Sequence, residues 1–199
     1  DMGLRVLALT LDNGFISDQA KGNIGRVVEA LGVEHRYMTT PAMNDIFVDS
    51  LQRFGNVCNG CYKTIYTLSM QTALDEDIPY IVTGLSRGQF FETRLTAELF
   101  TELTVSSDQI DANVLEARKA YHRVDDAVQR LLDVSMFEDD DVFDKVQFVD
   151  FYRFIDVGLD ELYTYLDERV PWSRPTDTGR STNCLINDVG IYYHRKVRG

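Results

Sequence analysis

Apolar runs alternate with segments of helical periodicity along the first half of the chain. Leu4 to Leu11 is almost continuously apolar, which is typical of a strand buried in a parallel sheet. Val33 to Met38 and Tyr80 to Val82 are two further short strand candidates. Asp18 to Leu31 and Thr64 to Leu74 carry apolar residues at helical spacing. Strands that alternate with helices in this way predict βαβ units and a parallel sheet, so the fold class is α/β.

Local signals mark where several of these elements begin and end. Ser17 is expected to cap the helix that starts at Asp18, and Gly32 is expected to end it. Pro41 begins a second segment with apolar residues at helical spacing, namely Met43, Ile46, Phe47 and Leu51.

The second half is more polar and mostly helical in pattern. Residues from Glu92 to about Val134 read as acidic helix, and the acidic run at 138–141 reads as an exposed loop. Val146 to Phe154 alternates as a strand does, and Gly158 to Leu166 is a helix candidate with four residues facing inward, namely Leu159, Leu162, Tyr163 and Leu166. We therefore expect an α/β core over residues 1–100. A helical extension over residues 101–199 is expected to pack its cysteine-bearing segment on that core.

Composition and charge narrow the class of protein. With 199 residues and 44% hydrophobic content, the chain can bury one sizeable core. Its 32 Asp and Glu outnumber 20 Lys and Arg, giving a net charge of −12, which disfavours a nucleic-acid partner because such a partner needs a basic face. No apolar run is long enough to span a bilayer and no signal peptide is visible, so we expect no membrane association and a cytoplasmic location.

The chain has three cysteines, and two of them form a C-x-x-C motif, Cys58 and Cys61, at the start of a predicted helix. This usage favours metal or redox chemistry in a reducing compartment over structural disulfides. The helix dipole is expected to lower the pKa of both thiols. The alternative is that these cysteines are small buried apolar residues.

These cysteines could belong to either of two kinds of metal site. A zinc site needs four nitrogen or sulfur ligands, and the other candidate ligands are Cys184, His35, His122 and His194. A [4Fe-4S] cluster held by Cys58, Cys61 and Cys184 would leave one iron open to substrate or sulfide. In either case we expect Cys184 to approach the other two near the carboxyl ends of the strands. The alternative for Cys184 is a buried structural thiol.

Polar turns follow two of the predicted strands. They are Asp12-Asn13-Gly14 and Thr83-Gly84-Leu85-Ser86. Ligands of open α/β sheets bind at this end of the strands, and the glycines allow close approach to the backbone. Asp12 is a candidate acceptor for a ribose or an amine, or else an ordinary turn aspartate. Arginines near the polar turns suggest anion recognition, namely Arg87, Arg94, Arg174 and Arg180.

Taken in order, these motifs resemble a known superfamily. The series is a strand with Asp12-Asn13-Gly14, then Asn56-x-Cys58-x-x-Cys61, then a strand with Thr83-Gly84-Leu85-Ser86-Arg87-Gly88-Gln89, then a late cysteine. It resembles the PP-loop ATP pyrophosphatases of the adenine nucleotide alpha-hydrolase-like superfamily. The most similar branches have paired cysteines: sulfurtransferases, thioamide-forming enzymes and N-acetyl sugar amidotransferases. The resemblance covers the first hundred residues well and continues more loosely from Phe148 to Cys184.

The resemblance implies a HUP-type (Rossmann-like) parallel sheet flanked by helices in a nucleotide-binding core, with a helical C-terminal extension. ATP would be cleaved to AMP and pyrophosphate with the help of Mg²⁺, and an adenylated substrate would then react with sulfide, persulfide or ammonia. The turn of Asp12, Asn13 and Gly14 would line the adenosine pocket. The second nucleotide loop would comprise Thr83, Gly84, Ser86, Arg87 and Gln89. The catalytic cysteines would be Cys58, Cys61 and Cys184, binding a cluster or carrying a persulfide.

The chain departs from this family at two points. Leu85 stands where the family often has histidine, and the Ser-Gly-Gly-x-Asp-Ser loop that defines the family is absent. We expect that loop to lie upstream of Asp1 in a longer parent protein. If so, the present chain alone is expected to be inactive or to bind nucleotide weakly.

Three functional hypotheses follow. The leading one is ATP-dependent adenylation of a small or carrier-bound substrate followed by sulfur insertion. The first alternative is amidotransfer with ammonia on the same fold, with cysteines that bind zinc or are structural. The second is a non-catalytic nucleotide-binding module. The expected partners are the substrate or its carrier protein, a protein that donates sulfur or ammonia, and further copies of the chain.

Overall fold

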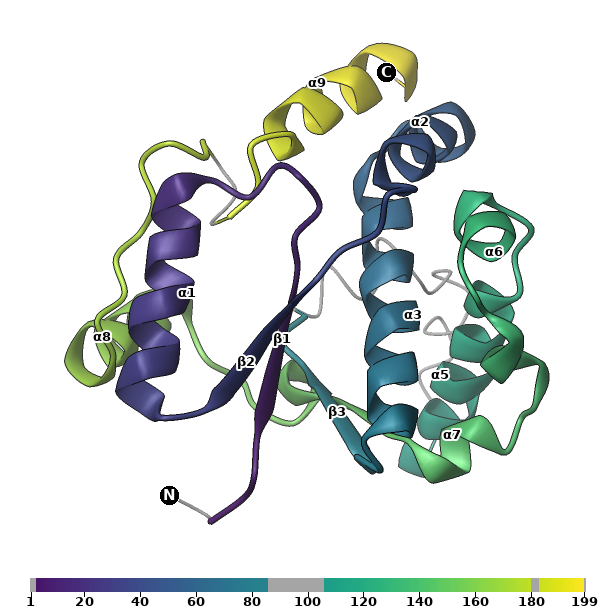
Figure 1. Ribbon diagram of the computed structural model, residues 1–199, viewed down its shortest axis with the longest axis horizontal. Helices are drawn as coiled ribbons and strands as arrows, with labels where there is room; N and C mark the ends of the chain where they lie inside the picture. The colour runs from purple at the N-terminus through teal and green to yellow at the C-terminus, as the bar shows by residue number, and fades with distance from the viewer. Residues whose placement is uncertain (1–2, 86–105, 180–182, 199) are drawn as a thin grey trace. The chain divides into compact units, whose positions relative to one another are not determined.

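The computed structural model describes residues 3–85, 106–179 and 183–198 (Figure 1). The chain is mixed α/β, and its described strands form two parallel pairs, β1–β2 and β3–β4. This confirms the parallel α/β class, whereas the strand order of one HUP-type sheet is not shown and stays a prediction. The chain divides into two compact units. Unit 1 comprises residues 1–65 and 157–199, and unit 2 comprises residues 66–156.

Unit 1 begins with a βαβ element of β1 (Leu7–Leu11), α1 (Asp18–Leu31) and β2 (Glu34–Met38). The two strands pair in register from Leu7 opposite Glu34 to Leu11 opposite Met38. As expected, the Ser17 hydroxyl accepts from the backbone N–H of Ala20 at 3.1 Å, and Gly32 ends α1 in the left-handed conformation. The apolar run suggested a fully buried strand, but within β1 only Leu11 is buried.

The rest of unit 1 is helical. Helix α2 (Met43–Phe54) follows Pro41 as expected, and α3 (Cys58–Asp75) starts at the first cysteine of the C-x-x-C motif. The part of α3 from Tyr66 onward belongs to unit 2. Helices α8 (Leu159–Arg169) and α9 (Asn187–Arg198) lie in the C-terminal part. The expectation that Leu159 faces inward is wrong, because its side chain is 68% exposed at the first position of α8.

Helices α2 and α3 approach each other closely at Gly60. A Cβ added there would lie 2.7 Å from Cγ2 of Ile46 and 3.1 Å from the backbone oxygen of Ile46. Ile46 and Phe47 on α2, together with Val57, are buried. Glycine at position 60 therefore lets the cysteine-bearing turn lie directly against α2.

Unit 2 contains the remaining described elements. These are β3 (Tyr80–Thr83), α5 (Ser107–His122), α6 (Ala127–Leu131), a 3₁₀ turn η2 (Ser135–Glu138), α7 (Val142–Lys145), β4 (Gln147–Asp150) and a 3₁₀ turn η3 (Phe151–Arg153). Their core contains six buried side chains, namely Met70, Ala73, Phe137, Val142, Phe143 and Val146. The strand predicted over 146–154 is shorter than expected, because the backbone turns into η3 at Phe151. The predicted boundary between residues 100 and 101 falls outside the described residues and stays a prediction.

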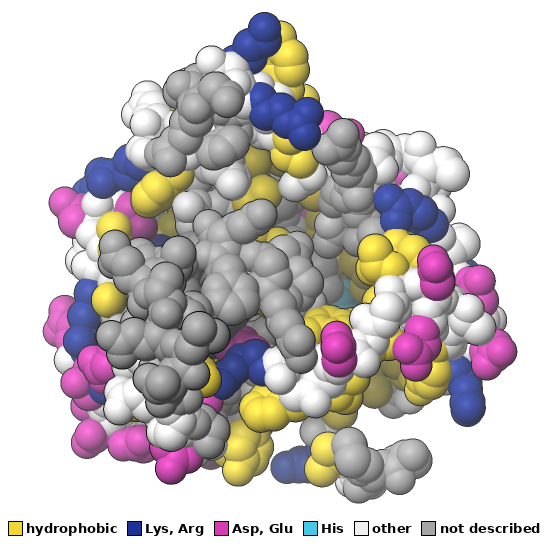
Figure 2. Space-filling view, turned by 180° about the vertical axis from the view of Figure 1, so that it is seen from behind, with side chains coloured by type: hydrophobic (Ala, Val, Ile, Leu, Met, Phe, Trp, Pro, Cys, Tyr) yellow, Lys and Arg dark blue, Asp and Glu magenta, His cyan; other side chains and the backbone are white. Residues whose placement is uncertain are grey.

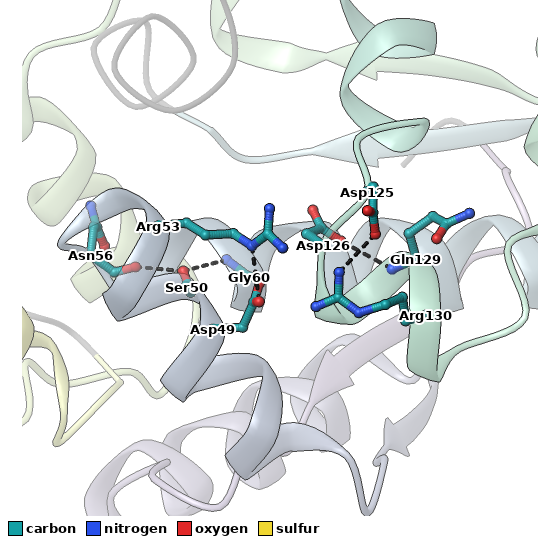
Figure 3. A network of polar contacts seen from close by, with 9 residues as sticks. All are labelled: Asp49, Ser50, Arg53, Asn56, Gly60, Asp125, Asp126, Gln129 and Arg130. Carbon is teal, nitrogen blue, oxygen red and sulfur yellow. Dashed lines mark hydrogen bonds and ion pairs between the residues drawn. The ribbon is translucent and has the colours of Figure 1, made fainter.

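Many charged side chains of both units are exposed. Figure 2 shows acidic and basic side chains interspersed on the face that it draws. Glu138 to Asp141 are exposed, as expected, and Asp140 pairs with Arg123. At the start of α6, Asp126 caps the helix by accepting from the backbone N–H of Gln129 at 3.0 Å (Figure 3). No helix among the described residues is both long and apolar enough to cross a membrane.

Candidate cysteine site

The first turn of α3 is fixed by hydrogen bonds to its free backbone N–H groups. The Asn56 side-chain oxygen accepts from the N–H of Cys58 at 2.6 Å, and the Ser50 hydroxyl accepts from the N–H of Gly60 at 3.0 Å. Ser50 in turn donates to the backbone oxygen of Asn56, as Figure 3 shows. Because these N–H groups already have partners inside the protein, this helix N-terminus holds the cysteines in place and is less open to an external anion.

A second backbone contact brings the distant cysteine to the end of β1. Cys184 forms an antiparallel bridge with Ile16. Its neighbours pair with the same stretch: Ser17 N–H donates to the oxygen of Asn183 at 3.0 Å, and Leu185 N–H donates to that of Phe15 at 2.8 Å. The C-terminal cysteine segment thus pairs with the chain that leads from β1 into α1.

Asparagine amides connect the three sulfur atoms. Nδ2 of Asn13 lies 3.4 Å from Sγ of Cys61 and 3.8 Å from Sγ of Cys184. Nδ2 of Asn187, the first residue of α9, lies 3.5 Å from Sγ of Cys58. The structure therefore gathers Cys58, Cys61 and Cys184, all as thiols, around two amide donors beyond the carboxyl end of β1.

The thiol pKa values of Cys58 and Cys61 are raised, whereas the helix dipole was expected to lower them. Burial raises the pKa of Cys61 to about 12, against the lowering effect of its hydrogen bond from Asn13. Burial also raises the pKa of Cys58, although the Asn187 amide acts in the other direction. The expectation of lowered thiol pKa values is therefore wrong for this arrangement, because desolvation of the charged form outweighs both the dipole and the amides.

The three cysteines supply donor atoms that suit a metal, but a metal site also needs the right geometry. Three thiols with amide donors are a suitable donor set for thiolate-ligated metals, which are soft. However, among the residues that the structure describes, no three His, Cys, Asp or Glu side chains are arranged to hold a metal ion. Two of the three histidine candidates have other contacts: His35 bonds the Thr10 hydroxyl at 2.9 Å, and His122 stacks on Phe137. The side chain of the third, His194, lies outside what the structure describes. The described residues thus offer no metal ion, neither zinc nor iron, a preformed position, and a metal or cluster bound by these cysteines stays a prediction.

The turn after β1 has a local structural role of its own. Oδ1 of Asp12 accepts from the N–H of Gly14 at 3.1 Å, and its Oδ2 forms an ion pair with Lys21 at 2.9 Å. The Lys21 partner is the main reason that the pKa of Asp12 is lowered. Gly14 has a φ of +82°, a conformation that glycine adopts without strain. These are the contacts of a turn aspartate, and a role in binding ribose remains a prediction.

The predicted second nucleotide loop is described only in part. Thr83 and Gly84 follow β3 in unit 2, whereas Ser86, Arg87 and Gln89 lie outside the described residues. The Thr83 hydroxyl donates to Oδ1 of Asp150 at 2.8 Å, so it bonds a neighbouring strand. Among the described residues, apart from its two chain neighbours, no atom lies within 4 Å of a Cβ added at Gly84. A ligand could therefore approach the backbone at Gly84, and the nucleotide expected there stays a prediction.

Three of the four arginines predicted to bind an anion lie outside the described residues. These are Arg87, Arg94 and Arg180. Arg174, which is described, donates to the Tyr163 hydroxyl at 2.6 Å. That tyrosine stacks on Trp172, with ring centroids 5.7 Å apart. Arg174 therefore contacts an aromatic pair of its own unit, and its proposed anion stays untested.

Sequence reasoning missed several residues that organise these sites. Asn187 contacts a sulfur, and only its position three residues after Cys184 hinted at this. Asn56 accepts from the N–H of Cys58, two residues later, as asparagine does in an Asx-turn, and this signal was readable. In unit 2, Arg118 bonds Asp150 at 2.8 Å. That pairing had no sequence signal, because the two residues are 32 positions apart.

Comparison with known proteins assigns no family to the chain. No family model matches it, and no solved structure matches it.

Proposed function

We propose that this chain is part of an ATP-dependent adenylating enzyme of the PP-loop class that inserts sulfur into a small or carrier-bound substrate. The observation that carries this proposal is the gathering of Cys58, Cys61 and Cys184 beyond the carboxyl end of β1. Ligands of open α/β sheets bind at that end of the strands.

The proposed reaction has two steps. A carbonyl-type oxygen of the substrate attacks the α-phosphorus of ATP, so that a P–O bond to pyrophosphate breaks and an adenylated substrate forms. A sulfur nucleophile then attacks the activated carbon, the C–O bond to AMP breaks, and a C–S bond replaces it. Mg²⁺ would offset the phosphate charge in the first step.

The cysteines would supply the sulfur side of this reaction. Cys58, Cys61 and Cys184 would hold a [4Fe-4S] cluster, whose fourth iron would present sulfide when the group is bound. In the persulfide variant, a sulfur-donor protein would place the terminal sulfur on Cys58 or Cys61. After this sulfur attacks the substrate, the thiol of the other cysteine would break the S–S bond, releasing the thiolated product and leaving a Cys58–Cys61 disulfide. In both cases the amides of Asn13 and Asn187 donate toward the cysteine sulfurs, where negative charge would accumulate.

The nucleotide side of the proposal rests on the turns that follow the strands. Asp12 to Gly14 and Thr83 to Gly84 each come directly after a parallel strand. In a HUP-type sheet these turns would face the adenosine and phosphate groups. Gly14 and Gly84 favour this placement because no side chain at these positions blocks the backbone.

The test is made on protein purified without oxygen. Iron, acid-labile sulfide and zinc are measured in one preparation, and AMP release from ATP is followed with sulfide and with ammonia as donors. We expect about four irons and four sulfides per chain and a thiolated product. An iron-free protein that is active with ammonia would instead establish amidotransfer. Tight ATP binding without any AMP release would establish a nucleotide-binding module.

A further inference from the structure

Helix α9, the last element of unit 1 (Figure 1), begins at the cysteine site and packs against it with one face. Nδ2 of its first residue, Asn187, lies 3.5 Å from Sγ of Cys58. Gly190, one turn later, is buried, and a Cβ added there would lie 2.8 Å from Cγ2 of Val57. This face of α9 therefore lies directly against the residue that precedes the C-x-x-C motif.

The opposite side of α9 is exposed and combines apolar, aromatic and basic side chains. Val189 and Tyr192 are each 64% exposed, and Tyr193 is 42% exposed. Nζ of Lys196 lies 5.7 Å from the centroid of the Tyr192 ring, and Arg195 is exposed as well. Val189, Tyr192 and Lys196 follow one another at intervals of three and four residues, so they lie on one side of the helix. Aromatic residues and arginine are enriched at protein interfaces, so this surface, called the α9 face below, has the composition of a docking site.

The basic groups of the α9 face differ from other basic groups of this acidic chain. In the rest of unit 1, Lys21, Arg36 and Arg53 pair with acidic neighbours at 2.7–2.9 Å. By contrast, no acidic side chain of the described residues forms an ion pair with Arg195 or Lys196. Their positive charge, beside exposed apolar surface, is complementary to an acidic partner.

A small acidic partner fits this charge pattern better than an extended anionic surface. Outside α9 the chain is even more acidic than its net charge of −12 indicates, because α9 itself is basic. A membrane or a long nucleic acid would meet much of that acidic surface and be repelled. Salt screens charges over about 8 Å at physiological ionic strength, so a small partner seated on one helix is affected much less by distant acidic groups.

We propose that the α9 face binds a small acidic protein, namely the carrier that brings the substrate to the cysteine site. This inference rests on the proposed function and deepens it, because it gives the carrier-bound substrate a docking surface. The 12 residues of α9 span about 18 Å, and the helix starts in contact with Cys58. A carrier seated on this face therefore holds its substrate close to the sulfurs.

Helix α8 provides a matched control for the test. Tyr165 is 59% exposed, and the guanidinium of Arg169 lies 5.6 Å from the centroid of its ring, in the same i, i+4 arrangement. There, however, the next residue is the exposed Glu168, so the local charge does not favour an acidic partner. The variants Tyr192→Ala and Lys196→Glu are therefore compared with Tyr165→Ala and Arg169→Glu.

The experiment is an NMR titration of the isotope-labelled full chain with a synthetic amphipathic peptide rich in glutamate and leucine, at low ionic strength. We expect saturable shifts at residues 187–198 and about tenfold weaker binding in Tyr192→Ala and Lys196→Glu, with the two α8 variants unchanged. Lys196→Glu should instead gain affinity for the same peptide with lysine in place of glutamate. No binding, equal binding by all variants, or shifts only elsewhere in the chain would overturn the inference.

Two further probes decide the class of partner. Vesicles of phosphatidylserine and phosphatidylcholine and a single-stranded oligonucleotide are titrated in the same way. Tighter binding of either one through Tyr192 and Lys196 would overturn an acidic protein as the partner.

This outcome is separable from the test of the proposed function, because peptide binding requires neither a metal nor a reaction. A chain that binds the peptide on the α9 face but releases no AMP supports the docking surface and counts against the proposed reaction. A chain that releases AMP and forms a thiolated product, but does not bind the peptide, overturns this inference alone.

Discussion

The ion pair between Arg118 and Asp150 in unit 2 allows a quantitative test of how this fold is held together. Both side chains are buried, with 8% and 3% exposed, and their closest atoms are 2.8 Å apart. Asp150 also accepts from the Thr83 hydroxyl at 2.8 Å, so each carboxylate oxygen has a donor. The guanidinium of Arg118 lies over the ring of Phe148, 4.1 Å from its centroid. Every polar group at this point therefore depends on the same carboxylate.

Replacing Asp150 with alanine leaves the Arg118 guanidinium buried without its carboxylate. Breaking a buried pair in this way costs about 3–5 kcal/mol of the free energy of unfolding. The change Thr83→Val removes only a hydrogen bond to the charged acceptor, so it should cost less, about 1.5–3 kcal/mol. Removing both charges in Arg118→Met with Asp150→Leu should recover most of the loss, because apolar replacements of a buried pair are often neutral.

Urea denaturation followed by circular dichroism measures these differences. The control is Glu34→Ala, which breaks a surface pair with Arg36 at 2.7 Å and should cost at most about 1 kcal/mol. The reasoning is refuted if Asp150→Ala costs no more than that control. The single variants Arg118→Met and Asp150→Leu are measured as well. The reasoning is equally refuted if the double variant loses as much free energy of unfolding as these two single variants added together, because the charges would then not be coupled.

Three smaller predictions concern unit 1. Gly60→Ala should lower the free energy of unfolding by about 1–3 kcal/mol in urea melts, since its Cβ would meet Ile46, whereas Gly25→Ala in α1 meets nothing and should raise it by about 0.5–1 kcal/mol. Equal effects would contradict the close packing. Ser17→Ala should cost about 1 kcal/mol by the same measure, and no loss would mean that the cap is redundant. Because the pKa of Asp12 is lowered, its contribution is present above the ordinary value of 3.8 and is lost as the pH falls below it. Thermal melts of Asp12→Asn and wild type should therefore differ at pH 7 and converge in acid, and a difference that grows in acid would reverse the assigned sign.

The elements that the sequence predicted well are those with local causes. Helix α1 has the predicted bounds of Asp18–Leu31 because a capping hydroxyl at Ser17 and a left-handed glycine at Gly32 determine its ends. Helix α3 begins at Cys58 because Asn56, two residues earlier, supplies an acceptor. In each case the residues that decide the boundary lie within one turn of it.

The predictions that were wrong, and the contacts that were not predicted, depend on residues distant in the sequence or on the packing of the whole unit. The dipole of α3 is local, so lowered thiol pKa values were a natural prediction for Cys58 and Cys61, but burial depends on how the whole unit packs. The contact of Asn187 with Cys58 joins residues 129 positions apart. Leu159 fits the helical pattern of α8, yet it lies at the first position of that helix and remains exposed. Periodicity predicts which face of a helix is buried, but it does not show at which residue along that face the burial ends.

Burial and the asparagine amides act on the pKa values of the cysteine thiols in opposite directions. Burial favours neutral thiols, with the pKa of Cys61 raised to about 12, whereas the amides of Asn13 and Asn187 favour charged sulfur. The metal cation that the proposed function requires would neutralise the thiolates inside the protein while the amides still donate to them. Binding of such a ligand must release protons from the thiols, so its affinity should rise with pH. Isothermal titration of the reduced chain with Co²⁺ in buffers of different ionisation enthalpy would count those protons, and binding without proton release would show that the metal does not bind through these cysteines.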